Sequence, residues 1–245
     1  MLDREINLDL FDPAVIEENS DFAVVYKPPR MHSVPLKESK GGTLVDWYEG
    51  QLMHRLDFET HGLVLFAKNQ KSYDFFKDLQ DRGEFIKEYS AVCTVCTDTD
   101  PKNGFPPPPN YSLSTTHYPL TLMSYFRPYG YGRKLVRPVV DAGSVPNKEV
   151  VKDKGGFYRT EITQIQHGEG KDLFMVRIRR GFRHQIRCHL AWNGRPIIDD
   201  PLYGGHSDSS SMQPLALCAH ALFFIDPSTG ESRESSIKPL NLTER

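Results

Sequence analysis

Polar side chains that could carry out acid–base chemistry or bind phosphate cluster in the segment MHRLDFETHGLVLFAK, residues 53–68. They are His54, Arg55, Asp57, Thr60 and His61, and an apolar run follows them directly. Because a carboxylate beside apolar residues loses hydration, Asp57 needs a neighbouring cation, such as an arginine, to stay ionised. Asp57 is therefore a candidate active-site residue, although an isolated acid in a turn more often caps or closes that turn.

Several reaction classes are disfavoured by motifs that the sequence lacks. HRLD is similar to the catalytic HRD of protein kinases, but there is no glycine-rich phosphate loop, DFG or Walker lysine loop. The GxSxG motif of a nucleophilic serine is also missing. His54, His61, His184, Cys188 and His189 match no standard set of ligand spacings, so we predict no metal site.

Positive charge is concentrated in one part of a chain whose formal net charge is −2. The stretch from 171 to 195 contains one acid, Asp172, against Lys171, Arg177, Arg179, Arg180, Arg183, Arg187 and Arg195. Such a cluster predicts a surface that attracts nucleic-acid phosphates. A solvated basic face without a partner is the alternative.

The expected elements place these residues between strands and helices. Strands are predicted at 22–27, 63–68, 85–95, 134–140, 157–166, 173–179 and 215–224, and helices at about 44–52, 70–82 and 183–194. Thr43 and Asp46 form a capping box for the first helix, and Gly83 closes the second. In the third, Ile186, Leu190 and Ala191 are expected to form the apolar face.

Composition and the positions of turn-forming residues complete the expected architecture. With 38% hydrophobic and 25% charged residues, no apolar run of about 20 residues and an acidic start, the chain is expected to be cytoplasmic. Cys93 and Cys96 are expected to be buried strand thiols. Residues 97–120 are too rich in proline for regular structure and predict an exposed excursion. Many strands with few helices predict an α+β domain built on a mostly antiparallel sheet.

Two long motifs resemble those of the pseudouridine synthases of the large-subunit-rRNA type A family. HRLDFETHGLVLFAK is similar to that family's HRLD, two variable residues, TSG and a strand ending in FAK. GFRHQIRCHLAWNGRPIIDDPLYGG is similar to its GRTHQIRxHLAxxGxPIxGDxxYG. Shorter agreements at DFAVVYKPP, KEYSAV and LALCAHALFFIDPSTG follow the same order, so the resemblance covers about 21–230. It implies an α+β catalytic fold, a mostly antiparallel mixed sheet with peripheral helices.

The resemblance implies roles for three residues. Asp57 matches the catalytic aspartate, which attacks the anomeric carbon of the target uridine or removes a neighbouring ribose proton. Tyr89 matches the tyrosine that stacks on the flipped base, and Arg187 matches the arginine that pairs with the aspartate. The freed uracil rotates and rejoins through its carbon 5. This isomerisation is redox neutral and implies no metal or organic cofactor.

Further residues are implied in binding the substrate. Arg55 matches the residue that fills the gap left by the extruded nucleotide. His54, Thr60 and Ile186 are expected to complete the pocket wall, and His184 is expected to pack or to contact phosphate.

Several positions depart from the family pattern. His61 replaces a serine, Arg30 and Asp199 replace glycines, and Phe182 and Arg183 replace the arginine and threonine of GRT. His61, Phe182 and Arg183 are expected to alter the choice of substrate.

The sequence therefore predicts an RNA pseudouridine synthase that acts on a uridine in an rRNA or tRNA stem-loop. A single catalytic domain is expected over 1–245, with no separate amino-terminal RNA-binding module. RNA is the one partner inferred, and neither a membrane nor an obligate protein partner is expected. The alternatives are a non-catalytic RNA-binding protein or RNA chaperone on the same fold, and an α+β domain whose basic patch is only solvated.

Overall fold

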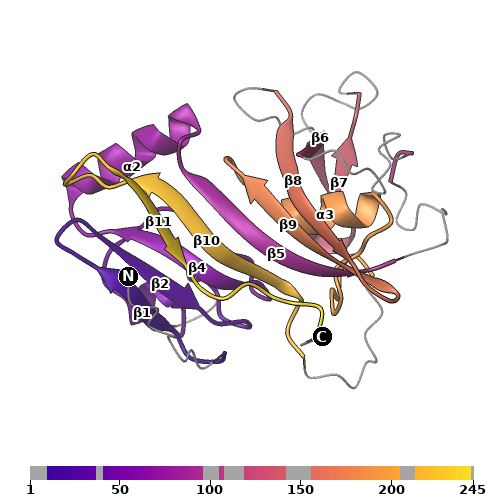
Figure 1. The fold of residues 1–245 in the computed structure, drawn as a ribbon, viewed down its shortest axis with the longest axis horizontal. Helices are drawn as coiled ribbons and strands as arrows, with labels where there is room; N and C mark the ends of the chain where they lie inside the picture. Colours follow the sequence, from indigo (N-terminus) through magenta and orange to yellow (C-terminus); the bar gives the residue numbers. More distant parts are fainter. Residues whose placement is uncertain are drawn as a thin grey trace. The chain divides into compact units, whose positions relative to one another are not determined.

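The computed structural model describes residues 10–36, 41–95, 105–107, 119–141, 156–204 and 213–243. The chain divides into two compact units, one formed by Met1–Glu88 and Cys218–Pro239, the other by Tyr89–Leu217 and Leu240–Arg245. Strands dominate both units (Figure 1), and the predicted α+β class is confirmed. The prediction of one catalytic domain over the whole length stays a prediction.

The first unit is built on a mixed sheet. Its strands lie in the order β1 (Ala14–Glu18), β2 (Phe22–Lys27), β4 (His61–Ala67) and β10 (Leu217–Ile225), while β3 (Gln51–Leu52) pairs with β4 and β11 (Ser232–Ser236) with β10. β2 runs antiparallel to β1 and β4, whereas β10 runs parallel to β4. Every residue of β2 and β4 is buried, which explains why their sequences are apolar except for Lys27 at the end of β2 and His61 at the start of β4.

Helix α2 (Gln70–Arg82) closes the core of this unit. Its Phe76 and Leu79 join a buried cluster with Phe22, Val24, Met53, Leu63, Leu65, Ala67, Phe85, Leu222 and Phe224. The side chain of Asn69 accepts a hydrogen bond from the backbone N–H of Ser72, and Gly83 ends the helix at φ 74°. The predicted helix at 70–82 is confirmed.

The helix predicted at about 44–52 is wrong in length. The capping box of Thr43 and Asp46 is present, but α1 covers only Leu44–Trp47. The following residues leave the helical conformation, and Gln51 and Leu52 pair with β4 instead. Tertiary strand pairing therefore overrides local helix propensity here.

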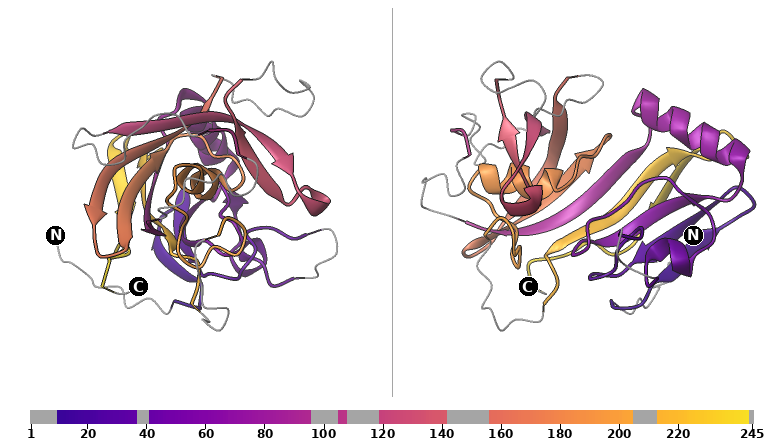
Figure 2. Two further views of the ribbon diagram at one scale, coloured as in Figure 1. Left: turned by 90° about the vertical axis from the view of Figure 1, so that its right-hand side faces the viewer. Right: turned by 180° about the vertical axis from the view of Figure 1, so that it is seen from behind.

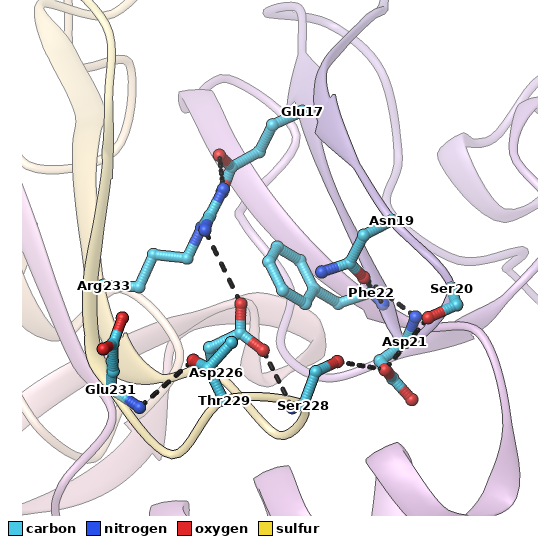
Figure 3. A network of polar contacts seen from close by, with 10 residues as sticks. All are labelled: Glu17, Asn19, Ser20, Asp21, Phe22, Asp226, Ser228, Thr229, Glu231 and Arg233. Carbon is cyan, nitrogen blue, oxygen red and sulfur yellow. Dashed lines mark hydrogen bonds and ion pairs between the residues drawn. The ribbon is translucent and has the colours of Figure 1, made fainter. Parts of the chain in front are cut away.

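Polar contacts hold two strands that the sequence did not predict, β1 and β11. Figure 3 shows how the turns that precede β2 and β11 are tied together. Arg233 pairs with Glu17 at 3.0 Å and lies 3.5 Å from Asp226. Ser228 donates a hydrogen bond to Asp21. Since every residue of β11 is polar, its sequence carries no hydrophobic alternation that could have revealed it.

The second unit orders its strands as β5 (Ile86–Thr94), β9 (Lys171–Ile178), β8 (Tyr158–His167), β6 (Leu120–Tyr129) and β7 (Leu135–Val139). The 3₁₀ turn η1 (Tyr131–Arg133) joins β6 to β7 in an antiparallel hairpin. Strand β6 was not predicted: Pro119 directly precedes it and Pro128 lies within it, and proline argues against a strand. Helix α3 (Gln185–Trp192) packs against β7 and β8 (Figure 2).

Two sequence expectations for the second unit are wrong. Helix α3 has no exposed polar face, because Arg187 and His189 are buried together with Ile186 and Leu190. Part of the proline-rich stretch is not an exposed excursion either. Phe105 is buried in the core and the indole N–H of Trp192 donates to the carbonyl of Pro106 at 2.9 Å.

The remaining parts of that stretch, 97–104 and 108–118, lie outside the described residues, as does Cys96. Cys93 is buried in β5, as expected for a strand thiol. Within the described ranges, none of the helices is both long and apolar enough to span a membrane.

Gly62 is a position where the fold tolerates no side chain, which gives a first prediction. A Cβ there would lie 2.3 Å from the carbonyl oxygen of Ala219 in β10, at a φ of 126°. We expect Gly62→Ala to lower the free energy of unfolding by about 2–4 kcal/mol in urea titrations. Gly181→Ala, whose Cβ would meet its nearest atom at 3.6 Å, is the control, and equal losses in the two variants would contradict the prediction.

Candidate active site

Asp57 opens a tight turn between β3 and β4. Its carbonyl accepts a hydrogen bond from the N–H of Thr60 at 3.2 Å, the pattern of a β-turn in which an aspartate is favoured at the first position. Asp57 is half-buried between the buried residues Leu56 and Thr60. The local sequence therefore places one carboxylate at a fixed point beside the core.

A neighbouring segment, residues 28–33, clamps the backbone on both sides of Asp57. The Ser33 hydroxyl donates to the carbonyl of Leu56 at 3.0 Å and accepts from the N–H of Leu56 at 3.1 Å. The carbonyl of Phe58 accepts from the N–H of Arg30 at 2.8 Å. We call residues 28–33 the clamp segment. Its hydrogen bonds preorganise the carboxylate-bearing turn.

Arg30 keeps a conformation suited to the glycine that the family pattern has at this position. Its φ is 60°, in the left-handed region, and Asp199, the other replaced glycine, also has a φ of 60°. Such a conformation costs a non-glycine residue about 1–2 kcal/mol. At both replaced positions the chain therefore adopts a left-handed conformation that glycine tolerates best.

Lys27, the last residue of β2, supplies a buried cation next to this turn. Its side chain is fully buried, and Nζ donates to the carbonyls of Pro28 at 2.7 Å, Met31 at 2.8 Å and Phe58 at 3.5 Å. Dehydration lowers the pKa of Lys27 to about 7, while the charges of Asp57 and Glu59 act in the opposite direction. Lys27 is thus a basic group of the first unit whose charged form is favoured by the charge of Asp57.

The histidines and the threonine of residues 53–68 are mostly packed inside the first unit. His54 Nε2 accepts a hydrogen bond from the N–H of Leu65 at 3.2 Å. Dehydration, together with the charge of Lys87, holds the pKa of His54 well below its usual range, so the ring is neutral. Thr60 and His61 are buried at the start of β4, whereas Arg55 is exposed.

Arg187 forms a buried ion pair within the second unit. Its Nε and Nη2 donate to Asp200 Oδ2 and Oδ1 at 2.8 and 2.7 Å, and both side chains are almost fully buried. Asp200 Oδ1 also accepts the N–H groups of Leu202 and Tyr203. The predicted pairing of Arg187 with Asp57, which belongs to the other unit, stays a prediction.

The other predicted residues of the second unit take part in its packing. The ring of Phe182 stacks on that of Phe126, with centroids 5.1 Å apart and an interplanar angle of 8°. His184 starts α3 at a φ of 56°, and its Nδ1 lies 3.2 Å from the hydroxyl of Tyr203. Ile186 and Tyr89 are buried. Their predicted substrate contacts are neither shown nor contradicted by this packing.

Two cations of the basic run 171–195 are paired within the fold, and the expectation that the run attracts RNA phosphates stays a prediction for the others. Arg187 is buried with Asp200, and Arg195 donates to Asp172 at 2.9 Å. Arg179 and Arg183 are exposed. In the described part of the chain, no group of histidine, cysteine, aspartate or glutamate side chains is arranged to hold a metal ion.

Sequence reasoning missed Lys27, Ser33 and Asp200. Lys27 was visible as a charged residue at the end of a wholly apolar strand. Asp200 was visible as the acid of the second long motif. Ser33 had no signal in its own segment, because its partner Leu56 lies 23 residues away in the chain.

Comparison with known proteins identifies the family. Residues 21–192 match the sequence profile of the family described as RNA pseudouridylate synthase. Because this match covers most of the chain, the chain belongs to that family, and the predicted resemblance is confirmed. This places it among the isomerases that act on uridine in RNA.

Individual relatives agree with this assignment. An uncharacterized RNA pseudouridine synthase of Helicobacter pylori (strain J99) is 27% identical over 213 residues, which cover 86% of this chain and 70% of the relative. One of Mycoplasma pneumoniae is 28% identical over 226 residues, covering 87% and 62%. The solved structure of human RNA Pseudouridylate Synthase Domain Containing 1 has a TM-score of 0.65 at 18% identity, covering 94% of this chain and 84% of that one. This last likeness shows a shared fold.

The buried amine of Lys27 leads to a pH-dependent prediction. Below about pH 7 the amine is charged in the folded and unfolded chains, so folding bears the full cost of burying the charge. As the pH rises from about 7 toward the ordinary value of 10.5, the folded amine is neutral while the unfolded one still binds a proton. The free energy of unfolding of the wild type, relative to Lys27→Met, should therefore increase by at most about 1.4 kcal/mol per pH unit.

Urea titrations at several pH values would measure this difference. Lys77→Met, which removes an exposed lysine from α2, serves as the control and should show no such trend. A difference between the wild type and Lys27→Met that stays constant with pH would refute a depressed pKa.

The Arg187–Asp200 pair gives a stability prediction. Asp200→Asn would leave the Arg187 guanidinium buried without its carboxylate, and we expect a loss of about 3–5 kcal/mol in the free energy of unfolding. Asp78→Asn, which breaks the exposed pair with Arg82, should cost less than about 1 kcal/mol. Chemical denaturation of both variants tests this, and a small loss for Asp200→Asn would argue against the buried pair.

Proposed function

We propose that this protein converts a uridine in an rRNA or tRNA stem-loop into pseudouridine, with Asp57 as the catalytic carboxylate. The observation that supports this most is the arrangement around Asp57. The backbone before and after it is hydrogen-bonded to the clamp segment, and the buried cation Lys27 lies within its electrostatic reach. A turn used only as a connection would not require so many constraints.

The reaction follows from a carboxylate acting on an extruded nucleotide. Asp57 attacks the anomeric carbon or removes a neighbouring ribose proton, and in either case the bond between the ribose and nitrogen 1 of uracil breaks. The uracil rotates and its carbon 5 bonds to the anomeric carbon. This displaces the Asp57 carboxylate in the first route, and in the second route the ribose regains its proton. Carbon 5 then loses its proton to solvent, and nitrogen 1 takes up a proton. Tyr89 is proposed to stack on the base, and Arg187 to pair with Asp57.

The RNA partner and its recognition are part of the same proposal. Base flipping costs a few kcal/mol and is cheapest for unpaired nucleotides, so a stem-loop in rRNA or tRNA is the expected substrate. Arg55 is exposed beside Asp57 and is proposed to occupy the position of the extruded nucleotide. Action in the cytoplasm and without an obligate protein partner completes the proposal.

Tritium release from RNA transcripts labelled at uracil carbon 5 tests this function. The wild type should release tritium from an rRNA or a tRNA transcript, whereas Asp57→Asn should reduce the rate by at least about 100-fold with RNA affinity nearly unchanged. Glu59→Gln alters the other carboxylate of the same turn and serves as the matched control, and it should keep most of the activity.

The alternative of an RNA-binding protein without catalysis predicts a different pattern. In that case neither the wild type nor any variant would release tritium from a transcript, although both would still bind RNA. If Glu59→Gln abolished release and Asp57→Asn did not, the assignment of the catalytic carboxylate would be wrong.

A further inference from the structure

The tip of the β6–β7 hairpin exposes an aromatic ring that contributes nothing to the core. Tyr131 is 97% exposed, within a turn whose flanking glycines, Gly130 and Gly132, have φ values of 78° and 63°. The next two residues, Arg133 and Lys134, are also exposed. One aromatic ring and two cations therefore face solvent from adjacent positions.

The whole hairpin is strongly basic. Residues 120–140 contain Arg127, Arg133, Lys134 and Arg137 and no acid, in a chain with a net charge of −2. Arg127 and Arg137 lie directly opposite each other in the antiparallel register. This charge pattern favours a polyanionic partner over an apolar one.

The tip is held in place by the rest of the second unit. The N–H of Arg133 donates to the carbonyl of Gly130 at 3.0 Å, and Arg133 itself has a φ of 54°. The side chain of Arg183 donates to the carbonyl of Arg133 at 2.7 Å. A turn that is fixed in this way presents Tyr131 at low entropic cost on binding.

We propose that the β6–β7 tip is a binding site for a single-stranded nucleotide of the RNA substrate, with its base stacked on Tyr131 and adjoining phosphates on Arg133 and Lys134. The inference rests on the proposed function in that the partner is RNA. Unpaired bases have a free face for stacking, whereas those of a duplex are already stacked, so the site selects single-stranded regions. None of these three residues is among those assigned to catalysis.

Two RNA probes separate stacking from general electrostatic attraction. One is a short stem-loop with an unpaired, uridine-containing loop, and the other is the blunt duplex of the same stem. Tyr131→Ala should weaken stem-loop binding about ten-fold, equivalent to about 1.4 kcal/mol, and change duplex binding less than about two-fold. Tyr131→Phe keeps the ring and should bind the stem-loop like the wild type.

Matched controls address charge and exposed aromatic area. Lys134→Gln should weaken binding of both RNAs and reduce the slope of log K against log salt by about 1, whereas Lys77→Gln on α2 should not. Phe11→Ala removes another exposed ring and should have no effect. Unchanged stem-loop binding by Tyr131→Ala, or equal losses for both RNAs, would overturn the inference.

The outcome remains separable from that of the proposed function. Tyr131-dependent binding of the stem-loop without any tritium release by the wild type would leave the site standing and refute the isomerase. Tritium release with full affinity in Tyr131→Ala would support the isomerase and refute this site.

Discussion

The burial of a single amine, that of Lys27, constrains much of the first unit. A fully buried ammonium needs several acceptors, and Lys27 finds them in the carbonyls of Pro28, Met31 and Phe58, which belong to two separate segments. Satisfying this one group therefore brings the clamp segment onto the turn of Asp57. The neighbouring strand β4 approaches β10 so closely at Gly62 that no side chain fits there.

In the second unit, too, buried polar groups need hydrogen-bonding partners, and here these groups lie on helix α3. Helix α3 can be buried on nearly all sides because its polar groups have partners. Arg187 pairs with Asp200, and His189 lies between Thr160 and Ser124 at 2.8 and 2.9 Å. Dehydration lowers the pKa of His189 to about 3, so the ring is neutral and adds no charge to the core. Polar satisfaction, more than amphipathicity, thus determines where this helix lies.

This arrangement separates the charges that build the fold from those available to RNA. Arg187 and Arg195, which looked like surface cations in the basic run, are used internally by Asp200 and Asp172. The cations of the β6–β7 hairpin, by contrast, have no acid within residues 120–140, and two of them, Arg133 and Lys134, closely follow the solvent-exposed Tyr131 in the chain. Local charge density in the sequence is therefore a poor guide to which cations face solvent, because it carries no information about their partners.

The sequence by itself determined the family, the α+β class and the elements with strong periodicity or caps, such as α2 between Asn69 and Gly83 and the buried strands β2 and β4. It also singled out Asp57, because two motifs in order mark that position. Only the tertiary structure decided that residues 51–52 pair as a strand and that polar β11 joins β10. It also decided that Lys27 and Ser33 hold the backbone around Asp57, and that Asp200 pairs with Arg187. The reason is physical: periodicity and caps are local properties, whereas the partner of a buried charge or hydroxyl is set by segments that meet only on folding.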